Sequence, residues 1–232
     1  MMCCLDLHIH SKYSFDSLMD IRTIIKTAKK RNLNGLAITD HNTIIGGQKA
    51  CQLNKERLLI IVGSEIATNI GDIIGLFLTK NVKSSDPSEV LDQIRSQGGI
   101  SVFPHPFKGH NLSDPKTIEI LKRVDCMEVL SSRSPIGLKE FQFLASFNCV
   151  PVAGSDAHFS VEMGLCRTVI DVDNMGLDEV KKALISGKSI AVGTYGPSYL
   201  QAMSQIIKNF KLKRIKPVIP QTVSLIREFK KR

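Results

Sequence analysis

Short apolar runs alternate with amphipathic segments of helix length along most of the chain. Apolar runs bounded by turn-forming residues predict buried strands, and apolar positions three or four residues apart predict amphipathic helices. We expect strands at residues 3–9, 35–39, 58–67, 72–78, 100–104, 126–130, 150–155 and 166–171. We expect helices at residues 20–32, 43–56, 86–97, 114–124, 136–147 and 176–186.

Strands separated by single helices predict βαβ units and a parallel sheet, so the fold class is α/β. Six or seven such units favour a barrel over an open sheet. Two of the helices begin with Asp-Pro, at 86–87 and 114–115, which is typical of a capping carboxylate followed by a proline in the first turn. Neither GxGxxG nor GxxxxGK[ST] follows the first strand, so a dinucleotide-binding or P-loop fold lacks its main signature.

The chain divides at "GTYGPS", residues 193–198. We expect a barrel domain over residues 1–195 and a basic helical extension over residues 196–232. Residues 205–232 hold nine Lys and Arg and one acidic residue, a net charge of +8, so the other 204 residues carry only +1. The basic character of the protein is therefore a property of its C-terminal segment.

The composition, 43% hydrophobic and 23% charged, is that of an ordinary soluble globular protein. No apolar run reaches the roughly 18 residues that a membrane span needs, so we expect no membrane partner. The N-terminus has no basic region before its apolar stretch and does not predict a signal peptide. The six cysteines form no CxxC pair and are expected to be reduced core residues of a cytoplasmic protein.

Histidines and acidic residues gather at the ends of the expected strands. Five of the six histidines lie there, with four acidic residues nearby: His8, His10, His41, His105, His158, Asp16, Asp40, Glu65 and Asp156. The strand ends of a parallel barrel face one side, and imidazole with carboxylate suits Zn, Mn and Fe ions. Each motif alone also fits a hydrogen-bonded histidine pair or a polar turn. Their recurrence at successive strands favours a metal site with several ions.

The motifs "DLHIHSKYSFD", "ITDHN", "GSEI", "PHP" and "GSDAH", in this order, resemble those of the PHP (polymerase and histidinol phosphatase) superfamily over about residues 4–192. The resemblance implies a distorted (β/α)7 barrel with two to three divalent ions, Mn, Fe or Zn, at its C-terminal face. Members of the superfamily are mostly phosphoesterases, and others are polymerase-associated exonucleases or proofreading domains.

The resemblance also implies a set of metal ligands. The first ion corresponds to a site held by His8, His10, Glu65 and Asp156. The second shares Glu65 as a bridge and uses His105, and the third corresponds to a site held by Asp16, His41 and His158. Relatives often have a histidine where "DIIG" places Asp72, so this carboxylate is either a ligand or a residue of the surface.

Three residues are expected to be catalytic: Asp40, His41 and Arg133. Asp40 either orients and deprotonates a water molecule or hydrogen-bonds a ligand histidine. Arg133, in "SSRSP", follows a strand and suits a bidentate contact with phosphate. Lys108 is a second substrate-binding candidate, unless it is a solvated loop lysine. Glu128 is either a partner of a ligand histidine or a buried structural acid.

These residues predict an enzyme that hydrolyses a phosphate ester of a small metabolite or nucleotide with a metal-activated water. The alternative is a nuclease, because the C-terminal segment interleaves basic and apolar residues: Lys208, Lys211, Lys213, Arg214 and Lys216 with Phe210, Leu212 and Ile215. The same segment also fits a helix packed on the barrel with its apolar side inward. A non-catalytic RNA-binding subunit would not need the complete ligand set. The sequence does not determine the oligomeric state.

Overall fold

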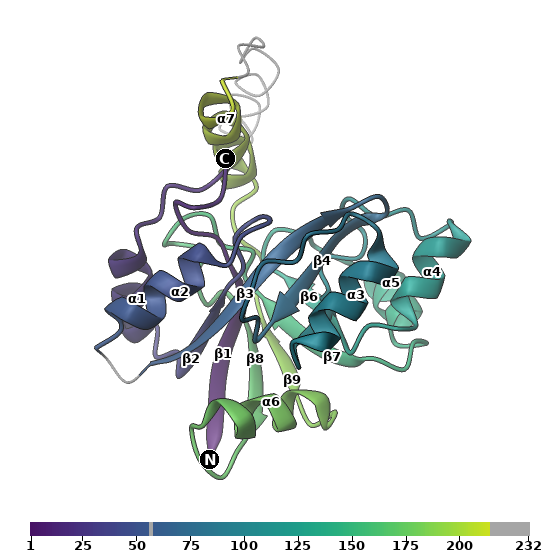
Figure 1. Ribbon diagram of the computed structural model, residues 1–232, viewed down its shortest axis with the longest axis horizontal. Helices are drawn as coiled ribbons and strands as arrows, with labels where there is room; N and C mark the ends of the chain where they lie inside the picture. The colour runs from purple at the N-terminus through teal and green to yellow at the C-terminus, as the bar shows by residue number, and fades with distance from the viewer. Residues whose placement is uncertain (56–57, 214–232) are drawn as a thin grey trace.

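The computed structural model describes residues 1–55 and 58–213. Within them, nine strands form one sheet in the order β7-β6-β5-β4-β3-β2-β1-β8-β9 (Figure 1). The strands are β1 (Met2–Ile9), β2 (Gly35–Ile38), β3 (Leu59–Thr68), β4 (Gly71–Leu76), β5 (Ile100–Phe103), β6 (Cys126–Ser131), β7 (Val150–Gly154), β8 (Cys166–Asp171) and β9 (Ile190–Gly193). The backbone of Ala157, just after β7, hydrogen-bonds to His8 and His10 of the β1 region, so the sheet curls into a nearly closed, distorted barrel.

The sheet is mixed, which corrects the expectation of a parallel sheet. β1, β2 and β3 are parallel, as are β5, β6 and β7, but β4 is antiparallel to both of its neighbours. β8 is antiparallel to β1, and β9 to β8. The reason at β4 is local: only residues 69–70 connect β3 to β4, which is long enough for a hairpin and too short for a crossover helix.

Seven helices occur in the described residues, and each expected helix is confirmed with ends shorter by a few residues. They are α1 (Ile21–Lys30), α2 (Ile45–Leu53), α3 (Pro87–Ser96), α4 (Pro115–Leu121), α5 (Leu138–Leu144), α6 (Leu177–Ile185) and α7 (Tyr199–Lys211). Asp86 and Asp114 cap α3 and α4 by accepting hydrogen bonds from backbone N–H groups, as the Asp-Pro pairs predict.

The apolar core has three parts, and their positions leave one end of the barrel for polar residues. The barrel interior is filled by side chains such as Leu5, Ile61 and Val152, and α6 adds Val180 and Leu184 to this cluster. A second cluster packs α3, α4 and α5 onto the outer face, and a third packs α1 and α2 there. In Figure 1, α6 lies at the lower end of the barrel near the N-terminus, opposite α7.

A register irregularity in β1 turns its histidines toward the barrel end. Leu5 and Leu7 pack in the barrel interior, whereas Ile9 packs with α1 on the outside. The pairing of β1 with β2 shifts between Asp6 and Ile9. Bulges of this kind bend a strand and re-aim side chains. Here the shift accounts for the presence of His8 beside residues of the interior.

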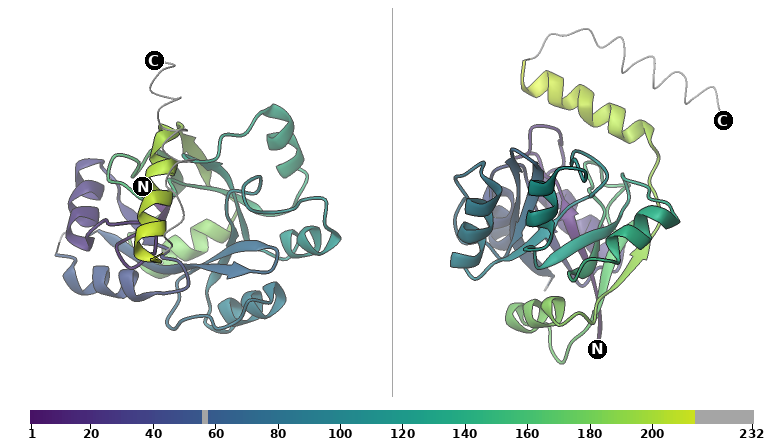
Figure 2. Two further views of the ribbon diagram at one scale, coloured as in Figure 1. Left: turned by 90° about the horizontal axis from the view of Figure 1, so that it is seen from above. Right: turned by 90° about the vertical axis from the view of Figure 1, so that its right-hand side faces the viewer.

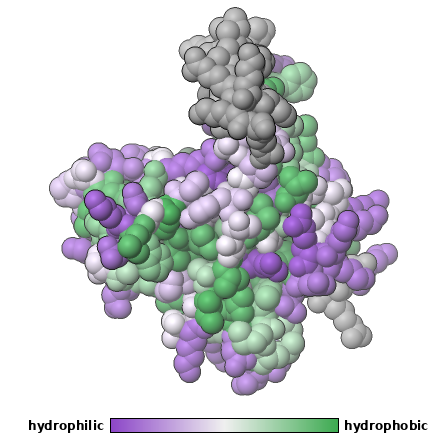
Figure 3. All heavy atoms as spheres, turned by 180° about the vertical axis from the view of Figure 1, so that it is seen from behind, coloured by the Kyte–Doolittle hydropathy of each residue, from purple (hydrophilic) through white to green (hydrophobic). Residues whose placement is uncertain are grey.

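The last described helix lies across the end of the barrel that is opposite α6 (Figure 2). Seen from behind, the surface mixes polar side chains with apolar ones, and the latter gather in the middle and lower part of this face (Figure 3). Among residues 1–55 and 58–213, no helix is both long enough and apolar enough to cross a membrane.

Candidate metal centre

The nine side chains predicted as metal ligands converge at the barrel end beneath α7. Their nitrogen and oxygen atoms form four overlapping groups, and within each group the atoms lie within 4.8 Å of one another. The groups are His8/His10/Asp156, His8/Glu65/His105, His41/Glu65/Asp72 and His10/Asp16/His41/His158. The residues come from β1, β3, β4 and the segments after β1, β2, β5 and β7, so the sheet brings together positions far apart in sequence.

Glu65 is the centre of the cluster. Its carboxylate lies 3.0 Å from His105 Nε2, 3.2 Å from His10 Nε2 and 3.3 Å from His41 Nδ1. Burial opposes its ionisation, but the surrounding histidines, His41 and His8 first, hold the pKa of Glu65 well below its ordinary value. An ionised, buried carboxylate that faces several imidazoles fits a bridging ligand between cations.

Glu128 fixes the orientation of His8. Glu128 Oε1 lies 3.1 Å from His8 Nδ1, and its other oxygen accepts a hydrogen bond of 2.9 Å from the backbone N–H of His105. A carboxylate on Nδ1 favours the tautomer that carries the proton there, which leaves the Nε2 lone pair for a metal. His8 Nε2 lies 3.1 Å from His10 Nε2, so both rings address the same point. Of the two alternatives for Glu128, the contact with a predicted ligand histidine, His8, is present.

Close packing behind His8 depends on Gly154. A Cβ atom at this position would lie 2.4 Å from His8 Cβ and 2.7 Å from Glu128 Oε1. Such contacts are far inside van der Waals distance, so only glycine lets β7 approach β1 closely at this point.

Asp6 holds the segment that carries Asp156. The buried Asp6 carboxylate accepts hydrogen bonds from the backbone N–H and hydroxyl of Ser155 and from the N–H of Gly164. Burial raises the pKa of Asp6 to about 6 against these hydrogen bonds. Asp156 has a φ of +52° and His105 one of +28°, an unfavourable region for residues with a Cβ. Strain of this kind concentrates at functional sites, where surrounding contacts maintain it.

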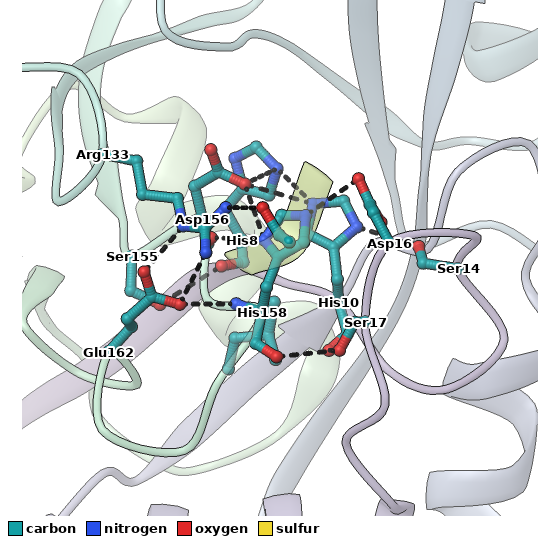
Figure 4. A network of polar contacts seen from close by, with 12 residues as sticks. His8, His10, Ser14, Asp16, Ser17, Arg133, Ser155, Asp156, His158 and Glu162 are labelled. Carbon is teal, nitrogen blue, oxygen red and sulfur yellow. Dashed lines mark hydrogen bonds and ion pairs between the residues drawn. The ribbon is translucent and has the colours of Figure 1, made fainter. Parts of the chain in front are cut away.

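Asp16 is the centre of the group that also contains His41 and His158. Its Oδ2 lies 3.2 Å from His41 Nε2 and 3.0 Å from His158 Nε2. Figure 4 shows Asp16 and His158 within the network of polar contacts. Burial acts against the charge of Asp16, but His158 and His41 keep its pKa well below the ordinary value. Asp16 Oδ1 is buried without a hydrogen-bond partner. An unsatisfied oxygen on an ionised carboxylate is costly, so this donor set fits a divalent cation.

Asp72 joins the cluster although β4 runs in the opposite direction. It lies at the start of β4, paired with Ala67 near the end of β3, and forms a ligand-type group with His41 and Glu65. Burial first, and the charge of Glu65 second, raise the pKa of Asp72. A cation between these carboxylates would relieve that repulsion.

The two expected phosphate-binding residues also line the site. Lys108 Nζ lies 3.1 Å from Asp156 Oδ2. Arg133 is buried, and its guanidinium forms a bidentate contact with the Glu162 carboxylate, to which Nε and Nη2 donate at 2.7 and 3.0 Å. Nη1 donates to Ser204 Oγ and Nη2 to the carbonyl of Leu200. These contacts use four of the five N–H donors, so the bidentate partner of Arg133 is Glu162.

Asp40 lies outside the cavity. Its carboxylate accepts hydrogen bonds of 2.6 and 2.7 Å from the N–H and hydroxyl of Ser11, the residue after His10. Asp40 therefore positions the segment that follows β1, and its role in activating water stays a prediction. His110 packs on Phe103, with ring centroids 4.1 Å apart, and is not itself among the residues that line the cavity.

The cluster opens into a cavity of about 190 Å³. Its walls are Asp16, His41, Glu65, Asp72, His105, Lys108, Gly109, Arg133, Asp156, His158, Ser204, Gln205 and Lys208. No pattern in the sequence indicated that Ser204 and Gln205 would lie here, and Lys208 was expected in a separate basic segment. Glu162 was also missed, although its spacing of four residues from His158 was a usable signal.

Comparisons with known proteins agree with this arrangement. The PHP domain model matches residues 6–120, and the PHP-associated model matches residues 138–189. An uncharacterized protein of Methanocaldococcus jannaschii is 37% identical over 169 residues, which cover 68% of this chain and 67% of the relative.

Two solved structures share the fold. A two-domain protein containing a predicted PHP-like metal-dependent phosphoesterase, from Bacteroides vulgatus, has a TM-score of 0.71 at 19% identity, over 89% of this chain and 70% of that one. The lesion-specific endonuclease PfuEndoQ of Pyrococcus furiosus has a TM-score of 0.64 at 15% identity, over 94% of this chain and 72% of that one. With the family matches and the cluster of His, Asp and Glu side chains together, the chain belongs to the PHP-domain family.

Proposed function

We propose that the protein hydrolyses a phosphate ester of a small phosphorylated molecule at a centre of two to three divalent ions. The observation that carries this proposal is the overlap of four ligand-type groups at one cavity that also contains Lys108 and Arg133. Ligand histidines and carboxylates suit Mn, Fe or Zn, and the cationic side chains suit a phosphoryl group.

Divalent ions bound here supply Lewis acidity and lower the pKa of a coordinated water toward neutrality. Nine side chains are proposed to hold them: His8, His10, Asp16, His41, Glu65, Asp72, His105, Asp156 and His158. Lys108 neutralises phosphoryl charge at the cavity wall. Arg133, paired with Glu162, leaves one N–H donor for a phosphoryl oxygen.

The test is a screen of the Mn²⁺-, Fe²⁺- or Zn²⁺-loaded protein against phosphomonoesters, nucleoside bisphosphates and short oligonucleotides. We expect two to three bound ions per chain by elemental analysis and hydrolysis of at least one small phosphomonoester. The His8→Ala variant is the matched control for contaminating phosphatases. A protein that binds no metal under any loading condition would contradict the proposal.

A nuclease activity is the second candidate, because the similar fold of PfuEndoQ is that of a lesion-specific endonuclease. It is tested in the same screen with intact and lesion-containing duplex DNA. Of the basic residues that support this candidate, Lys211 donates all of its ammonium hydrogens to carbonyls of the barrel. Lys208 and Lys211 contact the barrel, and Arg214 and Lys216 lie outside the described residues.

A further inference from the structure

Three residues of α7 share the cavity with the ligand cluster. Ser204, Gln205 and Lys208 are spaced so that they lie on one face of the helix, and all three line the cavity beside Asp16 and His158. Residues 199–211 lie outside both ranges that match the family models, 6–120 and 138–189. This wall of the cavity is therefore supplied by a segment beyond the matched part of the chain.

The N-terminal half of α7 is fastened to the metal centre through Arg133. The guanidinium donates to Ser204 Oγ at 3.0 Å and to the Leu200 carbonyl at 3.3 Å, while Gln201 Nε2 donates to the Arg133 carbonyl at 2.5 Å. Glu162, the ion-pair partner of Arg133, also accepts hydrogen bonds from the backbone N–H groups of His158 and Phe159. One buried network thus joins the helix to a ligand-bearing loop.

The C-terminal half is fastened by Lys211. Its ammonium donates to the carbonyls of Lys12, Ser14 and Ser17 at 2.8, 2.7 and 2.7 Å. These three bonds use every donor of the side chain. The carbonyls belong to the segment that carries Asp16, so α7 is anchored at both ends over the centre. Figure 2 shows the helix lying across this end of the barrel.

Lys208 sits between these anchors with its charge available. Its ammonium lies 4.6 Å from the centroid of the Phe15 ring, and Phe15 stacks on His41 with centroids 4.3 Å apart. A cation–π contact places an ammonium without neutralising it. Within residues 1–55 and 58–213, no carboxylate forms an ion pair with Lys208. A half-buried, unneutralised cation at the wall of a metal cavity is suited to an anionic substrate group.

The size of the cavity limits which substrate groups fit beneath α7. Its volume of about 190 Å³ is below the roughly 300–1,000 Å³ of typical ligand pockets. The space suits a phosphate group at the end of a molecule. An internal phosphodiester would have to continue away from the scissile group on both sides, and α7, anchored at both ends over the centre, leaves it less room than a terminal phosphate.

We propose that α7 covers this site and selects its substrate. Lys208 binds the substrate phosphate, and the anchored helix restricts the site to terminal phosphate groups. This inference rests on the proposed phosphoesterase function and adds to it a residue and a substrate class.

The first test measures binding rather than turnover. Inorganic phosphate is titrated into Mn²⁺-loaded wild type, Lys208→Met, Lys208→Arg and, as a matched control, Lys116→Met, whose side chain is exposed on α4. We expect phosphate to bind about tenfold to 100-fold more weakly to Lys208→Met, by the usual strength of a charge-assisted hydrogen bond. Lys208→Arg keeps most of the affinity, and Lys116→Met matches wild type. Equal affinity in Lys208→Met at unchanged metal content overturns the assignment of Lys208.

The second test compares a 5′-phosphorylated mononucleotide with circular single-stranded DNA, which has no terminal phosphate. We expect wild type to release phosphate from the first and leave the second intact, with kcat/KM for the mononucleotide falling about tenfold to 100-fold in Lys208→Met. If the circular DNA is cleaved as fast as the mononucleotide, the proposal that α7 restricts the site to terminal phosphate groups is wrong. If metal-loaded wild type hydrolyses none of the phosphomonoesters in the screen, the proposed function is contradicted. The phosphate titration still decides the role of Lys208.

Discussion

Replacing Glu128 with glutamine tests whether the residue behind His8 controls metal binding. Glu128 is 3% exposed and accepts two hydrogen bonds, from His8 Nδ1 and from the backbone N–H of His105. Glutamine has the same shape but only one accepting oxygen. If that oxygen serves His8, the amide NH₂ faces the His105 N–H, and two donors meet. If it serves His105, the NH₂ donates to His8 Nδ1 and the ring proton moves to Nε2, which then cannot bind a metal.

Either arrangement weakens the centre, and the loss of a partner behind a ligand histidine typically costs 10–100-fold in metal affinity or activity. We expect Glu128→Gln to bind Mn²⁺ about 10–100-fold more weakly in an equilibrium titration followed by electron paramagnetic resonance. The matched control is Glu119→Gln, at an exposed position of α4. Thermal unfolding without metal shows whether the variant is folded. Wild-type affinity and stoichiometry in a folded Glu128→Gln protein would refute the tautomer argument.

Four further changes test other parts of the site. His8→Ala removes a side chain shared by two ligand-type groups, so metal content and phosphoesterase activity should both fall to background, and a fully loaded variant would contradict the assignment. Asp72→Asn should lower the number of bound ions by about one in elemental analysis, whereas unchanged loading would make Asp72 a wall residue. Burial opposes protonation of His10, but contacts with its carboxylate neighbours raise its pKa to about 10, so the metal-free protein carries this proton at pH 7. Metal binding should therefore release protons and weaken as the pH falls, which calorimetry in buffers of different ionisation enthalpy measures; binding without proton release below pH 9 would contradict it. Arg133→Met leaves Glu162 buried without its partner and should lower the free energy of unfolding by about 3–5 kcal/mol in denaturant titrations, whereas a change below about 1 kcal/mol would show that the pair does not hold the site.

Local sequence patterns were sufficient for most elements and for most of the His, Asp and Glu side chains that the barrel brings together. The apolar runs located eight of the nine strands, because buried strands need continuous apolar positions. They missed β9, which is short and largely exposed, so its side chains leave a weak signal. Most of the predicted ligands lie near the end of a strand or in the segment that follows it, where the chain reaches the same edge of the barrel; Asp72, at the start of β4, is the exception.

The orientation of β4 and the status of Asp72 required the folded chain. A run of apolar residues has no direction in a sheet, and only the pairing of β3 with β4 shows that Asp72 begins a strand at the edge where Glu65 lies near the end of another. The partner of Arg133 also required the folded chain, since a bidentate contact with phosphate had been predicted. The buried Glu162 takes the fork of this guanidinium, and the pair meets across 29 residues of sequence.

The position of α7 was decided by tertiary structure alone. Periodicity allowed a packed amphipathic helix with its apolar side inward, yet Phe210 is 84% exposed, and the described contacts with the barrel include those of Lys208 and Lys211. The sequence by itself determined the βα order, the capped helices and the His, Asp and Glu residues at the strand ends, because these depend on neighbours within a few positions. The tertiary structure decided which carboxylate faces which histidine and what covers the cavity, because those contacts join residues that are distant along the chain.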